Sequence, residues 1–191
     1  MSDIKIRDFK KSDIKDLSLI VMDTWGFSDS FSMKLAVKMS RLYLAEALNE
    51  SNFCKVAEAD GEAVGFIAAR SDMLKKGSLK SKIFVFKALF PVIFNIEAIR
   101  AVKVFWDMSK LNKRLYKKAG IDFEGEITLF VLNIGARGKG IGGRLYSDAL
   151  DFIRRSGAGN YYIYTDTTCD YKFYEHKGAK KLSCEELFIP L

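Results

Sequence analysis

The strongest chemical signal in the sequence is a glycine-rich stretch, Gly135 to Gly143, with the residues GARGKGIGG. It follows an alternating apolar run typical of a β-strand and opens an amphipathic helical pattern. Glycines allow several backbone N–H groups to converge, and the N-terminus of a helix adds partial positive charge. Arg137 and Lys139 add two cations. Five glycines and two cations in nine residues are more than a plain tight turn needs, so the stretch predicts a cradle for phosphate groups.

Three kinds of phosphate loop compete for this stretch. A P-loop requires Lys and then a hydroxyl residue directly after Gly140, where the sequence has Ile-Gly, so that interpretation fails. A dinucleotide-binding fingerprint matches at Gly138, Gly140 and Gly143, and Asp166 follows as an acidic residue near the end of the next β-run. Too little chain follows to complete a doubly wound fold, but an NAD(P)-binding oxidoreductase stays an alternative. The third kind of loop holds the pyrophosphate of coenzyme A.

The loop resembles the signature loop of the GNAT superfamily of acyl-CoA-dependent N-acyltransferases, in the pattern Arg137-x-x-Gly140-x-Gly142. Three other segments resemble GNAT elements: IRDFKKSDIKDL, VAEADGEAVGFIAAR, and Phe173-Tyr174 with Gly178. The resemblance implies an α/β fold with a mainly antiparallel central sheet flanked by helices. It also implies acetyl-CoA as acyl donor, no metal, and cofactor-binding roles for the loop residues Arg137, Gly138, Lys139, Gly140, Ile141, Gly142 and Gly143.

The same resemblance assigns two catalytic roles. Glu126, on the strand before the loop, stands at the spacing where some GNAT enzymes carry a glutamate base, and it would take the amine proton directly or through water. A free glutamate has a pKa of about 4.3, so burial would have to raise it. Tyr174 resembles the general acid that protonates the departing thiolate. The thioester and the pantetheine arm would bind the strand backbone at Phe130, Val131 and Leu132.

Other reactive residue types have less specific interpretations. His176, the sole histidine, falls near an expected helix end, where its charge complements the helix dipole. Cys54, Cys169 and Cys184 are widely spaced, which disfavours both a disulfide framework and a zinc site. Cys169 has no histidine partner at a suitable spacing for nucleophilic catalysis. Tyr171 is the second candidate for the general acid.

Strands and helices alternate along the chain in the order that could position these residues. Asp60-Gly61 between two β-runs is a strong hairpin signal. Pro91 is expected as the first residue of an amphipathic helix that reaches Trp106. Alternation and helical periodicity predict strands at residues 4–9, 53–59, 63–70, 124–133 and 160–166, helices at 12–25, 35–48, 144–155 and 170–178, and a final β-run ending in LFIP.

The length of 191 residues and the apolar fraction of 49% predict a single domain, residues 1–191. The net charge of +7 is not evenly spread: residues 74–118, between the third and fourth strands, hold twelve basic and two acidic side chains. The resemblance to GNAT proteins implies that this segment is an insertion into the compact family pattern. Its longest uncharged stretch is nine residues, which is too short to span a membrane. A lid over the acceptor pocket, a funnel for an acidic substrate, an anionic-membrane contact and a solvated face all stay open.

These observations predict an acetyltransferase that moves the acetyl group of acetyl-CoA directly to an amine on a small molecule or a peptide. A non-catalytic CoA-binding or sensing module on the same fold is the alternative from another class. The charged N-terminus lacks the apolar region of a secretory signal, so we expect a cytoplasmic protein. No nucleic-acid partner is expected, because outside the insertion the chain is mildly acidic. A homodimer is left open.

Overall fold

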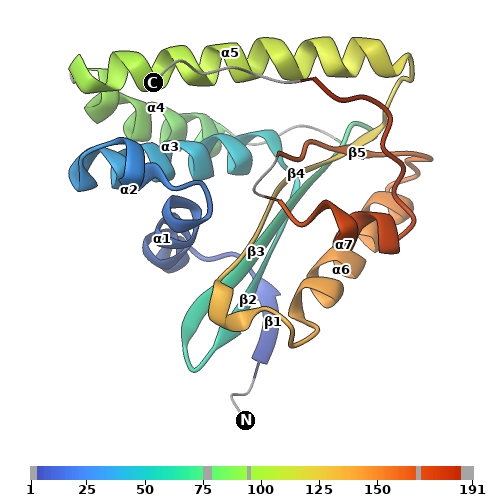
Figure 1. The fold of residues 1–191 in the computed structure, drawn as a ribbon. Helices are drawn as coiled ribbons and strands as arrows, with labels where there is room; N and C mark the ends of the chain where they lie inside the picture. Colours follow the sequence, from blue (N-terminus) through green and yellow to red (C-terminus); the bar gives the residue numbers. More distant parts are fainter. Residues whose placement is uncertain (1–3, 75–78, 94–95, 167–168, 186–191) are drawn as a thin grey trace. The chain divides into compact units, whose positions relative to one another are not determined.

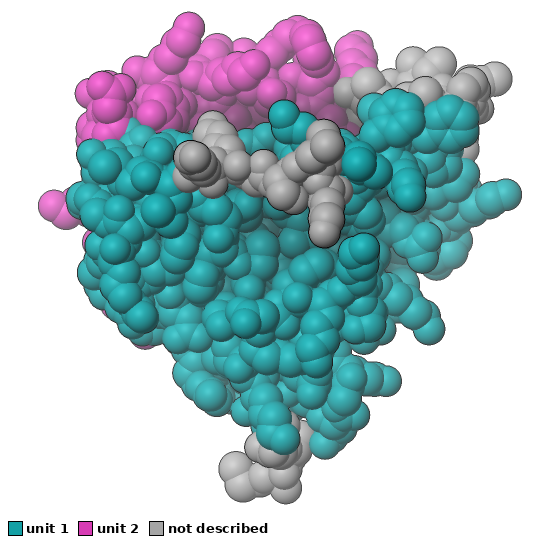
Figure 2. All heavy atoms as spheres, turned by 180° about the vertical axis from the view of Figure 1, so that it is seen from behind, with its two compact units in different colours: residues 1–92, 123–163 teal, residues 93–122, 164–191 magenta. Residues whose placement is uncertain are grey.

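The structure, a computed structural model, describes residues 4–74, 79–93, 96–166 and 169–185. The chain divides into two compact units, which Figure 2 shows in different colours. Unit 1 comprises residues 1–92 and 123–163, and unit 2 comprises residues 93–122 and 164–191. We describe each unit by itself. The single domain expected from the chain length stays a prediction.

Unit 1 is built on a five-stranded sheet with the order β1-β2-β3-β4-β5 (Figure 1). Its strands are β1 (Ile4–Asp8), β2 (Phe53–Ala59), β3 (Glu62–Ser71), β4 (Gly125–Leu132) and β5 (Tyr162–Ile163). All neighbouring pairs are antiparallel except β4 and β5, which run parallel. The predicted mainly antiparallel sheet is therefore confirmed.

The β2–β3 hairpin turns where the sequence indicates. Asp60 and Gly61 have φ values of 53° and 88°. Two successive positive φ values match the right-handed twist of the flanking strands in a tight hairpin. The turn brings Ala59 opposite Glu62 and Glu58 opposite Ala63, and the register shifts by one residue beyond Glu58.

Helices cover both faces of this sheet (Figure 1). One face packs on α1 (Ile14–Thr24) and α3 (Met33–Glu50), and the other on α6 (Ile141–Arg155). Leu17 of α1 and Leu44 of α3 are fully buried in one cluster with Phe66 and Leu129 of the sheet. On the opposite face, the ring of Phe130 stacks 6.2 Å from that of Tyr146 in α6. Burial of this apolar surface is the main source of the stability of such a layered fold.

A β-bulge in β4 decides which side chains share a face. Leu129 pairs with Ala68 and Ile127 with Ala69, so Thr128 is one extra residue in β4. The hydroxyl groups of Thr128 and of Ser51, at the end of α3, lie 2.6 Å apart. A bulge reverses the alternation of side chains beyond it. Thr128 and Leu129 therefore both face the α1 and α3 side, and Phe130 faces α6.

The predicted basic insertion contains two helices, α4 (Leu79–Ile93) and α5 (Ile96–Ala119), between β3 and β4. In unit 2, the segment after β5 contacts α5: Tyr164 Oη donates to the carbonyl of Asn112 at 2.9 Å, and Ser183 Oγ donates to that of Leu115 at 3.3 Å. Unit 2 also holds α7 (Tyr171–His176). Within the described ranges, no helix is both long and apolar enough to cross a membrane.

Three sequence-based expectations differ from the structure. Pro91 lies inside α4 rather than at the start of the next helix; it stands in the last turn, where the missing N–H costs only one helical hydrogen bond. The strand expected at 160–166 is only two residues long. A short helix, α2 (Phe27–Ser30), was not expected. The final β-run ending in LFIP falls outside the described residues.

Candidate functional site

The glycine-rich loop between β4 and α6 is turned by backbone conformations that favour glycine. Gly138 and Gly140 have φ values of +74° and +76°, and no atom lies within 4 Å of the place where a Cβ would stand on either residue. Before them, Asn133 accepts a hydrogen bond from the backbone N–H of Gly135 at 2.9 Å. A short 3₁₀ helix, Ile134–Ala136, follows. The loop is therefore ordered by local hydrogen bonds and open above its glycines.

The N-terminus of α6 leaves donors available at this loop. Gly140 is the N-cap, and none of the described side chains caps the helix. The N–H groups of the first helical turn have no partner within a helix, and they point outward with partial positive charge. Arg137 and Lys139 are exposed beside them, and Arg137 Nε donates to the carbonyl of Leu132 at 3.4 Å. The loop thus has the donors and charge that a pyrophosphate requires.

Beyond the bulge, β4 has no neighbouring strand on one side among the described residues. Along that edge β5 pairs with Glu126 and Ile127 only, so among the described residues no strand pairs with the stretch from Thr128 to Leu132 on the β5 side. The opposite edge pairs with β3 up to Leu132. An extended chain could add to such an edge by main-chain hydrogen bonds.

Glu126, at the other end of β4, lies among side chains from the two flanking strands. Its Oε2 accepts a hydrogen bond from Tyr162 Oη at 2.9 Å and lies 2.8 Å from Arg70 Nη1. Both contacts fall on the same oxygen, and no donor among the described residues reaches Oε1. The side chain is 14% exposed. Glu126 is therefore a mostly buried carboxylate with one oxygen available to a ligand.

Arg70 divides its charge among three carboxylates. Besides Glu126, its Nη1 lies 3.5 Å from Glu50 Oε2, and its Nε lies 3.0 Å from Asp72 Oδ1 without a hydrogen-bonding alignment. Burial raises the pKa of Glu126, and Arg70 and Tyr162 offset only part of that effect. The pKa of Glu126 therefore stays above its ordinary value.

Tyr174, the candidate acid, belongs to unit 2. Its ring is half-buried and packs edge-on against Phe173, with centroids 5.3 Å apart. Burial raises its pKa, and electrostatic repulsion from the nearby ionisable side chains of Cys169, Asp170 and Asp166 raises it further. The phenol is therefore protonated at neutral pH and can donate a hydrogen bond.

The other reactive residues lie in ordinary surroundings. Tyr171 is 53% exposed on α7, and the exposed His176 ends that helix, as its spacing indicated. Burial raises the pKa of Cys54 to about 12, which makes its thiol a poor nucleophile. Among the described residues, no group of three or more His, Cys, Asp or Glu could hold a metal ion.

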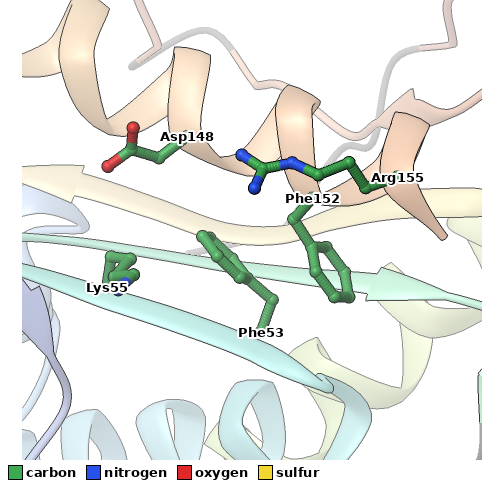
Figure 3. A pocket seen from close by; sticks show the side chains of 5 residues that line it. All are labelled: Phe53, Lys55, Asp148, Phe152 and Arg155. Carbon is green, nitrogen blue, oxygen red and sulfur yellow. The ribbon is translucent and has the colours of Figure 1, made fainter.

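A hollow of about 350 Å³ lies between β2 and α6 and is lined by none of the predicted site residues. Figure 3 shows its side chains: Phe53 and Lys55 come from β2, and Asp148, Phe152 and Arg155 come from α6. The rings of Phe53 and Phe152 stack with centroids 4.7 Å apart.

Arg70 and Tyr162 are the polar partners of Glu126 that the sequence did not reveal. Each stands opposite Glu126 on a flanking strand. In the sequence, Arg70 is an arginine at the end of an apolar run, and Tyr162 is one tyrosine among several. Neither position by itself indicates a contact with Glu126. Strand register, which depends on the bulge at Thr128, decides that they meet Glu126.

Comparison with solved structures identifies the fold. PH1933 from Pyrococcus horikoshii is 19% identical, with 96% of this chain and 93% of that chain covered at a TM-score of 0.64. A transcriptional regulator from Bacillus halodurans is 18% identical, with 99% of this chain and 100% of that chain covered at a TM-score of 0.57. The PaiA N-acetyltransferase from Thermoplasma acidophilum, solved in complex with coenzyme A, is 14% identical. The match covers 96% of this chain and 93% of that chain at a TM-score of 0.54.

These likenesses extend over nearly the whole chain, and at such identities they show the fold alone. The predicted α/β fold is confirmed: a mainly antiparallel sheet lies between helices, and two helices stand between the third and fourth strands. No family model and no curated relative match the sequence.

Proposed function

We propose that this protein is an N-acetyltransferase that moves the acetyl group of acetyl-CoA directly to an amine. The observation that carries the proposal is the stretch of β4 beyond Ile127 that β5 does not cover, with the open glycine loop beyond one end and Glu126 at the other. At about 3.3 Å per strand residue, Glu126 and Leu132 lie about 20 Å apart along the strand. The pantetheine arm and the acceptor amine would share this length, with the amine on the Glu126 side of the thioester.

The loop would bind the pyrophosphate of the cofactor. Gly138 and Gly140 keep the space above the backbone open, and the first turn of α6 supplies N–H donors. Arg137 and Lys139 would pair with the phosphate charges. The backbone of Phe130, Val131 and Leu132 would hold the pantetheine arm as an added strand, and an N–H group near Phe130 would polarise the thioester carbonyl.

Glu126 would act as the general base. Its Oε1 would take a proton from the acceptor amine, directly or through water, while the nitrogen forms a bond to the carbonyl carbon and the carbon–sulfur bond breaks. Arg70 and Tyr162 hold Oε2, which leaves Oε1 for that proton. A pKa above the ordinary value makes the carboxylate a stronger base than a solvated glutamate.

Tyr174 would act as the general acid for the leaving group. Its protonated phenol would donate to the sulfur as negative charge develops there, and the proton would end on the thiol of coenzyme A. The raised pKa keeps this phenol protonated across the neutral range. The acceptor would be an amine on a small molecule or a peptide.

Two other activities are tested by the same experiment. A nicotinamide-dependent oxidoreductase is disfavoured because the dinucleotide fingerprint works in a parallel, doubly wound sheet, whereas this sheet is mainly antiparallel. A non-catalytic CoA-binding module would share the cradle but not the chemistry.

The experiment follows free thiol release from acetyl-CoA with a panel of amines, together with calorimetric titration of CoA and NAD(P). Amine-dependent thiol release with CoA binding is the expected result. Saturable CoA binding without turnover for any amine would favour the module. NAD(P) binding without CoA binding would overturn the assignment of the loop.

A further inference from the structure

Helix α4 carries an apolar stripe on its exposed side. Ile83, Phe86 and Phe90 are 48%, 67% and 54% exposed, although such side chains are usually buried. With 3.6 residues per turn, the three lie within about 60° of arc. Val92, about 150° from the middle of that stripe, is fully buried. The helix thus has one buried side and, nearly opposite, an exposed apolar one.

Two lysines border this stripe. Lys82 and Lys87 are exposed, and each lies about 40° beyond one edge of the stripe on the helical wheel. The sequence from Leu79 to Val92 contains no acidic residue. A band of apolar side chains between lysines is the pattern of helices that lie in a membrane interface. There the apolar side chains enter the acyl region and the lysines extend toward the phosphates.

We propose that this face of α4, made of Ile83, Phe86 and Phe90 between Lys82 and Lys87, binds the surface of an anionic lipid bilayer. Such a surface offers negative headgroups directly beside an apolar layer, which matches both parts of the face. The proposal goes beyond the acetyltransferase assignment and does not depend on it.

Charge disfavours a second copy of the chain as the occupant. A two-fold contact pairs a surface patch with itself. Two α4 faces in contact would bring the lysines at positions 82 and 87 of both copies together, and the helix has no carboxylate between Leu79 and Val92 to pair with them. Like charges at close range repel, whereas lipid phosphates would neutralise them.

The other helix of the insertion, considered by itself in unit 2, has a similar chemistry. Trp106 on α5 is 63% exposed, and Lys110 Nζ lies 5.5 Å from the centroid of its ring. Further cations are exposed along α5 at Lys103, Lys113 and Lys117. Trp and Lys both combine an apolar body with a polar end suited to a membrane interface. The surplus positive charge of the insertion thus accompanies exposed aromatic side chains on each helix.

The test is co-sedimentation of the full chain with two kinds of vesicle, phosphatidylcholine alone and an equimolar mixture of phosphatidylcholine and phosphatidylglycerol. We expect binding to the anionic vesicles only. Each lysine near an anionic surface contributes about fivefold to partitioning, so Lys82→Glu with Lys87→Glu should weaken binding about thirtyfold or more. Phe86→Ser with Phe90→Ser should weaken it about tenfold or more.

The matched control reverses two exposed lysines outside the insertion, Lys15→Glu with Lys34→Glu. This variant has the same net charge as the α4 double reversal and should lose less than about threefold in partitioning. Equal losses in both reversals, equal binding to both kinds of vesicle, or full binding by the phenylalanine variant would overturn the proposal. A dimer in sedimentation velocity that the phenylalanine variant abolishes would also overturn it, because the face would then belong to a second copy.

Discussion

Two arginine–carboxylate pairs in unit 1, Arg7–Asp13 and Arg70–Glu126, are similar in burial but differ in how the carboxylate is held. The Asp13 oxygens lie 2.8 Å from the two terminal nitrogens of Arg7, and Oδ2 also accepts from the backbone N–H of Lys10 at 2.7 Å. Both oxygens of Asp13 are therefore occupied, whereas the described contacts of Glu126 fall on Oε2 alone.

The two carboxyl groups consequently have pKa values shifted in opposite directions. Burial tends to raise both. At Asp13, hydrogen bonds from Arg7 and Lys10 outweigh burial and hold the pKa below its ordinary value. At Glu126, burial dominates and the pKa rises. A carboxylate with both oxygens occupied stabilises the fold, whereas one with a raised pKa and an available oxygen suits proton transfer.

The largest expected effect is on catalysis through Glu126. Glu126→Gln keeps the shape and the Tyr162 contact but removes the base, so turnover of acetyl-CoA with an amine should fall about 10²- to 10⁴-fold. CoA affinity, measured by calorimetry, should stay within about twofold because the loop is unchanged. Glu62→Gln, an exposed glutamate on β3, is the control and should keep full activity. Full activity in Glu126→Gln would show that Glu126 is not the general base.

Glu126 can act as a base only when the cofactor is bound, and a substitution at Gly140 tests that binding. Gly140→Glu places bulk and negative charge in the cradle, so CoA affinity should fall about 100-fold or more. Gly157→Glu, at the other end of α6, is the matched control, because Gly157 also has a positive φ and open space around it. An equal loss of affinity in both variants would attribute the effect to backbone strain.

A substitution at Asp13 tests whether a carboxylate with both oxygens occupied stabilises the fold. Asp13→Asn leaves Arg7 with less compensating charge and should lower the free energy of unfolding by about 2 kcal/mol at neutral pH, less than for a fully buried pair because Arg7 is partly exposed. Because the pKa of Asp13 is lowered on folding, its contribution is present above the unfolded pKa of about 3.9 and is lost as the pH falls through the folded value.

Denaturant titrations of wild type and Asp13→Asn at neutral and acidic pH measure this difference, with Asp29→Asn, an exposed carboxylate, as the control. The gap between wild type and Asp13→Asn should shrink as the pH falls. A constant gap, or one that grows in acid, would contradict the assigned direction of the pKa shift.

Tyr174 is the proposed proton donor, and its role can be tested in the same way as that of Glu126. Tyr174→Phe removes the proton donor and should lower turnover about tenfold or more with little change in CoA affinity. Tyr171→Phe, on the exposed side of α7, is the comparison variant. If Tyr171→Phe loses activity and Tyr174→Phe does not, the acid role passes to Tyr171.

The smallest effect is a change in the pKa of Glu126. Tyr162→Phe removes a hydrogen bond that favours the charged carboxylate, so the pKa of Glu126 should rise further. The acid limb of the activity profile should move to higher pH by the same amount. An unchanged limb would mean that Tyr162 does not influence the carboxylate during turnover.

Local patterns in the sequence predicted much of the fold. The hairpin at Asp60-Gly61 and the loop before α6 were predictable because their turns need glycine or aspartate within a few residues. The partners of Glu126 were not, because Arg70 and Tyr162 meet it only through strand register. The end of α4 was also missed, since Pro91 is tolerated in a last helical turn as well as in a first one.

The most direct test is the pH dependence of kcat/KM for acetyl transfer by the wild type and by Glu126→Gln. Because the pKa of Glu126 is raised, wild-type activity should fall with decreasing pH through an apparent pKa above the ordinary glutamate value of about 4.3. The residual activity of Glu126→Gln should lack that limb. A limb that persists unchanged in Glu126→Gln, or a wild type that transfers no acetyl group to any amine, would contradict the proposed role of Glu126.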